Sequence, residues 1–236
     1  MDVFPGFLSL IFVTISFFVA IKIVIKYFEV KNKIFIYVGV SWIGLGMPWL
    51  TDAISSILIL TINTALNAYA KVIIELAFLP FFLITWLTGF TELLYKERQI
   101  IIISISIVLG IVFEIILFTL MYLNFSLIGT LKTAVDIEYS FYILIYLFSF
   151  MGIFLITGIK FGLKTLKTDD PVLKLKGKFI IAAFISFTIG ALLDALISIH
   201  LIWIIVIRAI LISSSIEYYL GFILPEKVKN LILKKS

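Results

Sequence analysis

Long apolar stretches separated by short polar segments dominate the chain. Crossing a hydrocarbon core of about 30 Å takes about 20 helical residues, because each residue adds about 1.5 Å. The stretch 179–224 is too long for one crossing, so we expect a helical hairpin with its tip at residues 198–200. The pattern predicts helices over residues 4–25, 34–60, 66–94, 100–123, 139–163 and the two arms of 179–224.

The composition agrees with a membrane protein. Of 236 residues, 63% are hydrophobic and 14% are charged, and the mean hydropathy is +1.24. A soluble domain cannot cover that much apolar surface. Within lipid the backbone must satisfy its own hydrogen bonds, and continuous apolar runs favour helices over the alternating strands of a barrel. We therefore predict an all-α, polytopic integral membrane bundle of seven transmembrane helices, forming one domain over residues 1–236.

Basic residues indicate the orientation. With seven crossings, the lysine-rich segments 26–33, 96–98, 164–178 and 227–235 all fall on one side, whereas Lys71 and Lys132 fall on the other. Basic loops stay in the cytoplasm, so the N-terminus is expected outside and the C-terminus in the cytoplasm. Asp2 precedes the first apolar run where a signal peptide would be basic, which favours an uncleaved span. We expect a multi-pass protein of the plasma membrane, with no nucleic-acid partner despite the net charge of +5.

A parallel internal repeat is one interpretation of three matched segments. Lysine spacings after the first span recur after the fifth, and Asp52-Ala-Ile-Ser-Ser-Ile57 resembles Asp194-Ala-Leu-Ile-Ser-Ile199. Helices 1–3 and 5–7 would then be copies joined by helix 4. The alternative is coincidence, because any helix entering from the cytoplasm begins with lysines; only the aspartate segments are independent of that effect.

Five of the charged residues inside the predicted spans come from five different helices. Depths counted from the helix ends place all five at one level in the outward half, and none can face lipid at low cost. We expect them to converge inside the bundle as a ligand-binding or proton-linked site. These residues are Asp52, Glu75, Glu114, Asp194 and Arg208.

The charges do not balance, because four carboxyl groups face one guanidinium. An ion pair of Arg208 with Asp194 or Asp52 that only locks the bundle is the alternative explanation for the arginine. The remaining acids must be protonated, bind a cation or contact water. Asp52 and Asp194 are the best candidates for function because they recur in the same local sequence. Glu114 is expected to be a protonated structural group.

Other polar positions are secondary. Glu217 lies toward the cytoplasmic half of the last helix, as a structural partner or a second polar site. His200 is the only histidine, at the expected hairpin tip, where it is an ordinary polar loop residue or, as the alternative, a metal-binding or pH-sensing group. Pro48 and Pro80 each lie near a candidate acid, and a proline either opens a cavity beside that acid or only kinks the helix.

Several classes are disfavoured. The chain has no cysteine and one histidine, so we expect no metal site and no cofactor. No lysine in the last helix is available for a retinal Schiff base, and no HExxH, GxSxG or P-loop motif is present. We therefore expect that the protein is not an enzyme; an intramembrane enzyme is the third-ranked hypothesis.

The segment Tyr219-Leu-Gly-Phe-Ile-Leu-Pro-Glu226, followed by basic residues, resembles the end of seven-helix membrane domains. Such domains occur at the N-terminus of some prokaryotic sensor kinases and as stand-alone archaeal relatives. The resemblance covers the number of spans, the orientation and this exit segment. It implies an input module that reads an external or membrane signal. The sequence ends at Ser236 without an output domain, so a partner protein would have to carry the signal.

Two functional hypotheses follow from the sequence. The first is a receptor-like sensory module with an outward-facing acidic pocket, in which an unidentified small ligand or ion engages the five charged residues. Its partners would be the lipid bilayer and a cytoplasmic signalling protein bound through the basic loops. The alternative is a small secondary transporter for protons, cations or a small cationic solute. A transporter needs polar groups that continue to the cytoplasm, whereas a sensor needs a closed inner half.

Overall fold

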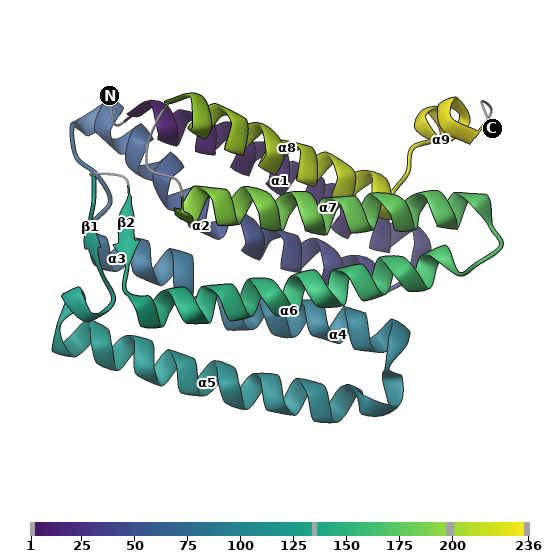
Figure 1. Ribbon diagram of the computed structural model, residues 1–236, viewed down its shortest axis with the longest axis horizontal. Helices are drawn as coiled ribbons and strands as arrows, with labels where there is room; N and C mark the ends of the chain where they lie inside the picture. Colours follow the sequence, from purple (N-terminus) through teal and green to yellow (C-terminus); the bar gives the residue numbers. More distant parts are fainter. Residues whose placement is uncertain (1–2, 134–135, 197–200, 234–236) are drawn as a thin grey trace.

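A bundle of long, roughly parallel helices forms the body of the protein (Figure 1). The computed structural model describes residues 3–133, 136–196 and 201–233. Seven helical segments of this part are long and apolar enough to cross a membrane, as the sequence predicted. The helices are α1 (Val3–Val30), α2 (Ile34–Ile62), α3 (Ala68–Val72), α4 (Leu79–Leu94), α5 (Gln99–Leu123), α6 (Phe141–Leu166), α7 (Pro171–Leu196), α8 (Leu201–Phe222) and α9 (Glu226–Leu233).

The third span is not one regular helix. Residues Ile73–Ala77 form a π-helical turn, η1, between α3 and α4. Pro80 lies in the first turn of α4, where its missing N–H costs no helical hydrogen bond. Wide π turns inside helices often occur at functional sites. Glu75 lies within η1, so this wide turn changes the direction in which its side chain points.

Six of the spans close into a ring, and the fourth lies outside it. The order around the ring is α1, α2, α4, α6, α7 and α8, which returns to α1. Helix α5 lies outside the ring beside α4 (Figure 1), and its Phe113 stacks on Tyr146 of α6. Most of its apolar side chains stay exposed. Close packing depends on small residues, since a Cβ at Gly44 would lie 2.0 Å from the ring of Phe82, and one at Gly158 would lie 2.3 Å from the ring of Phe184.

Aromatic side chains fill the middle of the ring. Trp42 stacks on Tyr218 with ring centroids 3.7 Å apart, and Phe184 lies between Tyr218 and Trp86. Trp42, Tyr218 and Phe184 are at most 1% exposed. The hydroxyl of Tyr218 donates a hydrogen bond of 2.9 Å to the backbone oxygen of Val38, which satisfies its polar end. The interior between the two ends of the bundle is thus mostly packed ring against ring.

The connection between α5 and α6 contains a hairpin that the sequence did not indicate. Strands β1 (Gly129–Leu131) and β2 (Ile137–Tyr139) pair antiparallel, with Gly129 opposite Tyr139. A short 3-10 turn, η3 (Phe125–Leu127), precedes them. The hairpin lies across one end of the bundle, beside α2, α3 and α6 (Figure 1). We call this end the hairpin end and the opposite one the basic end.

The predicted loop 164–178 was wrong. Helix α6 continues to Leu166 and α7 begins at Pro171, so only residues 167–170 connect them. The lysines of this segment suggested a loop, but long lysine side chains can lie along a helix while their ammonium groups reach water. Pro171 starts the helix at a position that suits proline, and the Asp170 side chain accepts a hydrogen bond from the Val172 backbone. The predicted hairpin tip, 198–200, lies outside the described residues.

Candidate functional site

Arg208 of α8 forms one centre of polar contacts at the hairpin end. Its side chain is 5% exposed. One terminal nitrogen, Nη1, lies 2.7 Å from Asp194 Oδ1 on α7, and the other, Nη2, lies 3.8 Å from Asp52 Oδ2 on α2. Its Nε donates to the hydroxyl of Ser9 on α1 at 3.2 Å. A single guanidinium therefore connects four helices, as its rigid fork of donors allows.

Trp49 completes this centre. Its indole Nε1 donates to Asp194 Oδ2 at 2.8 Å, so both carboxylate oxygens of Asp194 have a partner. The guanidinium carbon of Arg208 lies 5.8 Å from the Trp49 ring, within the range of a cation–π contact. Asp52 and Asp194 still keep 20% and 27% of their side-chain surface open. The centre is thus strongly bonded, while its two carboxylates stay partly exposed.

Glu75 forms the second centre. The π turn places its carboxyl inside the ring, where it is 7% exposed. The hydroxyl of Thr51 donates to Oε1, and the hydroxyl of Tyr139, in β2, donates to Oε2. Burial raises the pKa of Tyr139 well above its usual value, so this hydroxyl stays protonated and acts as the donor. The hairpin is thereby bonded to the third span through Glu75.

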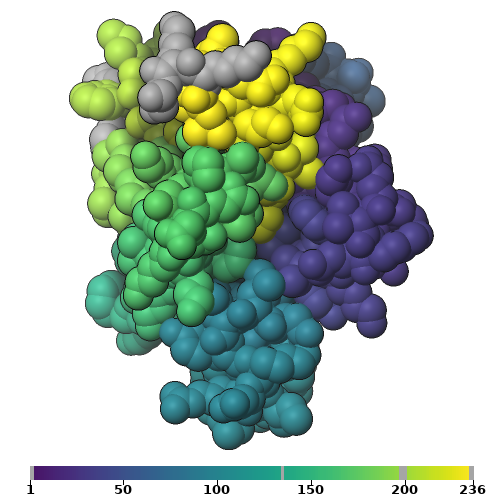
Figure 2. Space-filling view, turned by 90° about the vertical axis from the view of Figure 1, so that its right-hand side faces the viewer, coloured from purple at the N-terminus to yellow at the C-terminus, as the bar shows by residue number. Residues whose placement is uncertain are grey.

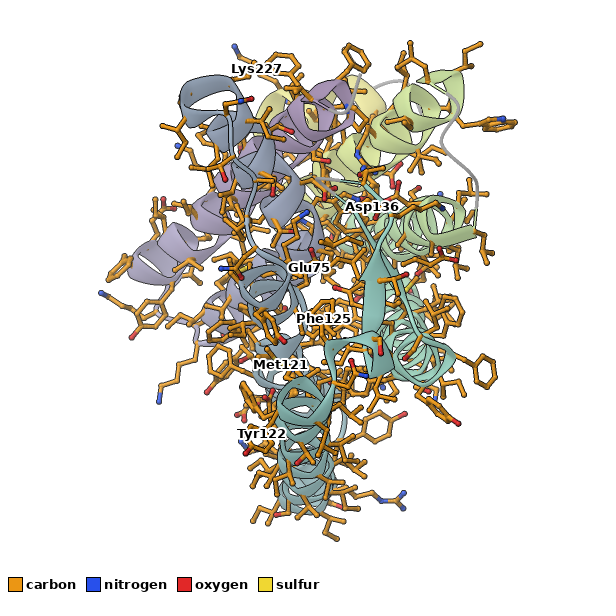
Figure 3. The ribbon with its side chains drawn as sticks, turned by 90° about the vertical axis from the view of Figure 1, so that its left-hand side faces the viewer. Glu75, Met121, Tyr122, Phe125, Asp136 and Lys227 are labelled. Atoms are coloured by element: carbon orange, nitrogen blue, oxygen red, sulfur yellow. The ribbon has the colours of Figure 1, made fainter. Side chains whose placement is uncertain are left out.

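Lys71 and Asp136 link the two centres. Lys71 of α3 is completely buried and interacts electrostatically with Asp52, Glu75 and Asp136. Asp136 stands at the start of β2, and Figure 3 shows it on the hairpin above Glu75. Burial raises the pKa of Asp136, whereas the positive charges of Lys132 and Lys71 oppose that rise. A carboxyl outside the spans therefore belongs to the same electrostatic group as three inside them.

These residues form one site, which we call the charged cluster. It contains four carboxyl groups and two cationic groups, so it carries an excess of negative charge when all of them are ionised. Charges in so dry a setting must be paired, protonated or compensated by a bound cation. The members of the charged cluster are Asp52, Lys71, Glu75, Asp136, Asp194 and Arg208.

The structure brings together four of the five residues that the sequence singled out. Asp52, Glu75, Asp194 and Arg208 are in the charged cluster, whereas Glu114 is not. Helix α5 lies outside the ring, and the charge of Glu114 acts on Tyr146 of α6. Within the described chain, its Oε1 is buried without a hydrogen-bond partner. The common depth of the five residues stays a prediction, and a common depth would not specify which helix joins the ring.

The secondary candidates lie elsewhere or outside the described residues. Glu217 accepts a hydrogen bond of 2.9 Å from Ser213 of the same helix, about two and a half turns beyond Arg208. His200 falls in the segment 197–200 and lies outside the described residues. No group of three histidine, cysteine or acidic side chains in the described ranges is arranged to hold a metal ion.

Sequence reasoning missed Lys71, Asp136 and the roles of Tyr139 and Trp49. Lys71 was counted only as a charge on the outer side, although its spacing from Glu75 is four residues. Residues four apart share one face of a helix, so this spacing was a usable indication. Asp136 had no such indication, because the unforeseen hairpin carries it to the cluster. Whether Pro48 and Pro80 open a cavity or only kink their helices stays open, and each proline lies within two helical turns of a cluster residue.

Comparisons with known proteins give no relative. No protein-family model, no curated protein and no solved structure matches this chain.

Proposed function

We propose that the protein is a receptor-like sensory module of the plasma membrane, with the charged cluster as its input site. One observation carries the proposal: six charged groups from five different segments meet at the hairpin end, and packed aromatic rings separate them from the basic end. Buried ionisable groups in a membrane bundle are expensive and usually serve a function.

The proposed orientation follows from the basic residues. The helix ends, turns and tail at the basic end together carry most of the lysines, and basic segments stay in the cytoplasm. The N-terminus and the hairpin would then lie outside and the C-terminus inside. Asp52 and Asp194, whose side chains are partly open, would face the exterior. This supports an outward-facing input site.

The packing of the inner half favours a sensor over a carrier. Trp42 lies seven residues, or about 10 Å, from Trp49 along α2 toward the basic end. Its stack with Tyr218 fills the ring at that depth. Glu217, the one strong acid candidate for an inner polar path, bonds to Ser213 on its own helix. A solute that passed the cluster would meet aromatic rings rather than a second charged site.

Arg208 supplies a physical route for the signal. It holds α8 to α1, α2 and α7 through Ser9, Asp52 and Asp194. A ligand that neutralises or displaces the carboxylate of Asp52 or Asp194 weakens the contacts between α8 and its neighbouring helices. Helix α8 runs the length of the bundle to Phe222, and three residues separate it from the start of α9 at Glu226. A shift of α8 would therefore reach the basic end, where the partner protein is proposed to bind.

Protons or a small organic cation are the proposed ligands. An excess of negative charge attracts either one, and protonation of a carboxylate beside Arg208 removes the attraction directly. The described acids do not form a metal site, which favours these ligands over a metal ion. The ligand must distinguish the two states of α8, because a ligand that binds both equally shifts nothing.

The internal repeat is part of the proposal. Asp52 and Asp194 occupy matched sequence segments, and both lie against the same guanidinium. A duplication of a three-helix unit would explain why two aspartates approach Arg208 from two sides.

A proton or cation carrier is the second candidate, and one observation favours it. Buried hydroxyls and an indole continue below the cluster, and Ser16 Oγ and Trp42 Nε1 have no hydrogen-bond partner within the described chain. Buried polar atoms of this kind can be bridged by internal water. Such a path would reach past the aromatic stack.

Flux measurements separate the two candidates. We would reconstitute the protein in liposomes, impose a pH or cation gradient, and follow internal pH and uptake for the wild type and Asp194→Asn. The sensory proposal predicts the same background flux for both and for empty liposomes. Uptake by the wild type that is lost in Asp194→Asn, with Glu138→Gln as an exposed acidic control at the same end, would overturn it.

A further inference from the structure

The basic end contains a cavity that the proposed input site does not use. It has a volume of about 670 Å³ and lies between the α1–α2 turn and the α4–α5 turn. Figure 2 shows the basic end face-on, with both turns at its surface. The cavity is lined by Lys31, Asn32, Lys33, Ile34, Tyr37, Glu92 and Lys96.

Positive charge dominates this lining. Three ammonium groups face one carboxylate, and that carboxylate is already paired, because Lys96 donates to Glu92 four residues earlier in the chain. Lys31 has φ of 57° and its ammonium lies 5.9 and 5.8 Å from the rings of Tyr27 and Phe28. These contacts hold the Lys31 side chain near the turn instead of leaving it extended in water.

The start of α2 adds to the attraction for an anion. Lys33 is the N-cap of this 29-residue helix, and a long helix carries partial positive charge at its N-terminus. The first backbone N–H groups are occupied, since Ile34 donates to Asn32 Oδ1 and the next residues donate to the carbonyls of Asn32 and Lys33. An anion in the cavity would therefore be held by ammonium groups and the helix dipole rather than by backbone N–H groups.

Apolar surface borders the cavity. Val30, Leu93, Tyr95 and Ile100 flank the two turns, and each is 40% exposed or more. Residues of this kind at the end of a membrane span face lipid chains, and aromatic residues such as Tyr95 mark the level of the headgroups. The cavity thus lies where polar headgroups meet the apolar helix surface.

We propose that this cavity binds the phosphate of an anionic phospholipid headgroup, whose acyl chains lie on the neighbouring apolar surface. Basic pockets at the ends of membrane helices suit such headgroups, which combine a phosphate charge with chains that must stay in the bilayer. Free phosphate shares the charge but lacks the chains, so the apolar border favours the lipid. The inference is independent of the sensory proposal.

Native mass spectrometry tests the lipid site. The protein in detergent micelles is titrated with phosphatidylglycerol or, as the neutral comparison, phosphatidylcholine, and bound lipids are counted. We expect one saturable phosphatidylglycerol site in the wild type. The triple variant Lys31→Gln, Lys33→Gln, Lys96→Gln should bind it at least about 30-fold more weakly, since each lysine near an anionic lipid contributes severalfold.

A matched variant removes equal charge elsewhere. Lys164→Gln, Lys167→Gln, Lys174→Gln changes three exposed lysines at the same end, outside the cavity lining, and should leave the affinity within about twofold. Glu92→Gln keeps the three lysines and should tighten binding. Equal weakening in both triple variants, or no effect of Glu92→Gln with a folded protein, would overturn the site. Displacement of the lipid by millimolar inorganic phosphate would overturn the assignment to a lipid.

Discussion

Charge is held differently at the two ends of the bundle. At the hairpin end, Arg208 is 5% exposed and contacts Asp194 at 2.7 Å within a network from several helices. At the basic end, the pairs Lys26–Glu29 and Lys229–Glu226 join neighbours on one helix, and their glutamates are 60% and 86% exposed. Exposed pairs contribute little to stability, whereas breaking a buried pair leaves an uncompensated charge. The charged side chains of the hairpin end therefore depend on particular contacts between helices, whereas those of the basic end contribute mainly through their net charge.

Removal of Arg208 is expected to have the largest effect. Arg208→Met leaves Asp194 and Asp52 without their cation, and should lower the free energy of unfolding by about 3 kcal/mol or more. Thermal or denaturant unfolding of the purified protein measures this. Arg98→Met, at an exposed arginine of the basic end, is the control and should change little. Similar losses in both variants would remove the distinction between the two ends.

Asp194 and Asp52 should interact with Arg208 to different extents. A double-mutant cycle of Arg208→Met with Asp194→Asn should give a coupling energy of about 1.5–3 kcal/mol, typical of a charged hydrogen bond. The cycle with Asp52→Asn should give a smaller coupling energy, because Asp52 Oδ2 lies 3.8 Å from Arg208 Nη2. Equal coupling energies would contradict this and would mean that Arg208 interacts as strongly with Asp52 on α2 as with Asp194 on α7.

The hairpin should depend on Glu75. Tyr139→Phe removes a hydrogen bond to a buried carboxyl and should lower the free energy of unfolding by about 1.5–3 kcal/mol. Tyr142→Phe is the matched control, because Tyr142 is 77% exposed, and it should change the stability by less than about 0.5 kcal/mol. Unfolding at constant pH measures both. An unchanged Tyr139→Phe variant would show that the hairpin is not anchored by this contact.

The smallest effect is expected from Asp136 and depends on pH. Burial raises its pKa in the folded protein, so above pH 4 the folded state binds more proton at this site than the unfolded state. Its contribution to stability therefore falls as pH rises from the unfolded pKa of about 4 through the raised folded pKa. Asp136→Asn should flatten this fall. Unfolding curves between pH 4 and 8 measure it, with Glu138→Asn as the exposed control on the same hairpin.

The fold was largely predictable because lipid simplifies the physics. A helix in lipid must be long and apolar, so span number and most helix ends could be derived from runs of residues. The loop predicted at 164–178 was wrong because lysines also occur within helix ends, and α7 includes Lys174, Lys176 and Lys178. The orientation and the repeat stay predictions.

The contacts of the site were predictable only in part. Asp52, Asp194 and Arg208 were expected to meet because buried charges need partners, and both aspartates do lie against Arg208. Glu114 shows the limit, since its helix packs outside the ring. The hairpin adds Tyr139 and Asp136 through a connection of weakly patterned residues, which hydropathy cannot describe.

The proposed sensory function requires that the charged cluster sets the conformation of the basic end. Because the chain has no cysteine, Lys167→Cys and Lys227→Cys can carry spin labels at two exposed positions of that end. The distance distribution between them is measured with and without Asp194→Asn, and with Glu138→Gln as the control. We expect Asp194→Asn to shift the distribution and Glu138→Gln to leave it unchanged. An unshifted distance distribution in a folded Asp194→Asn protein would show that the charged cluster does not set the conformation of the basic end.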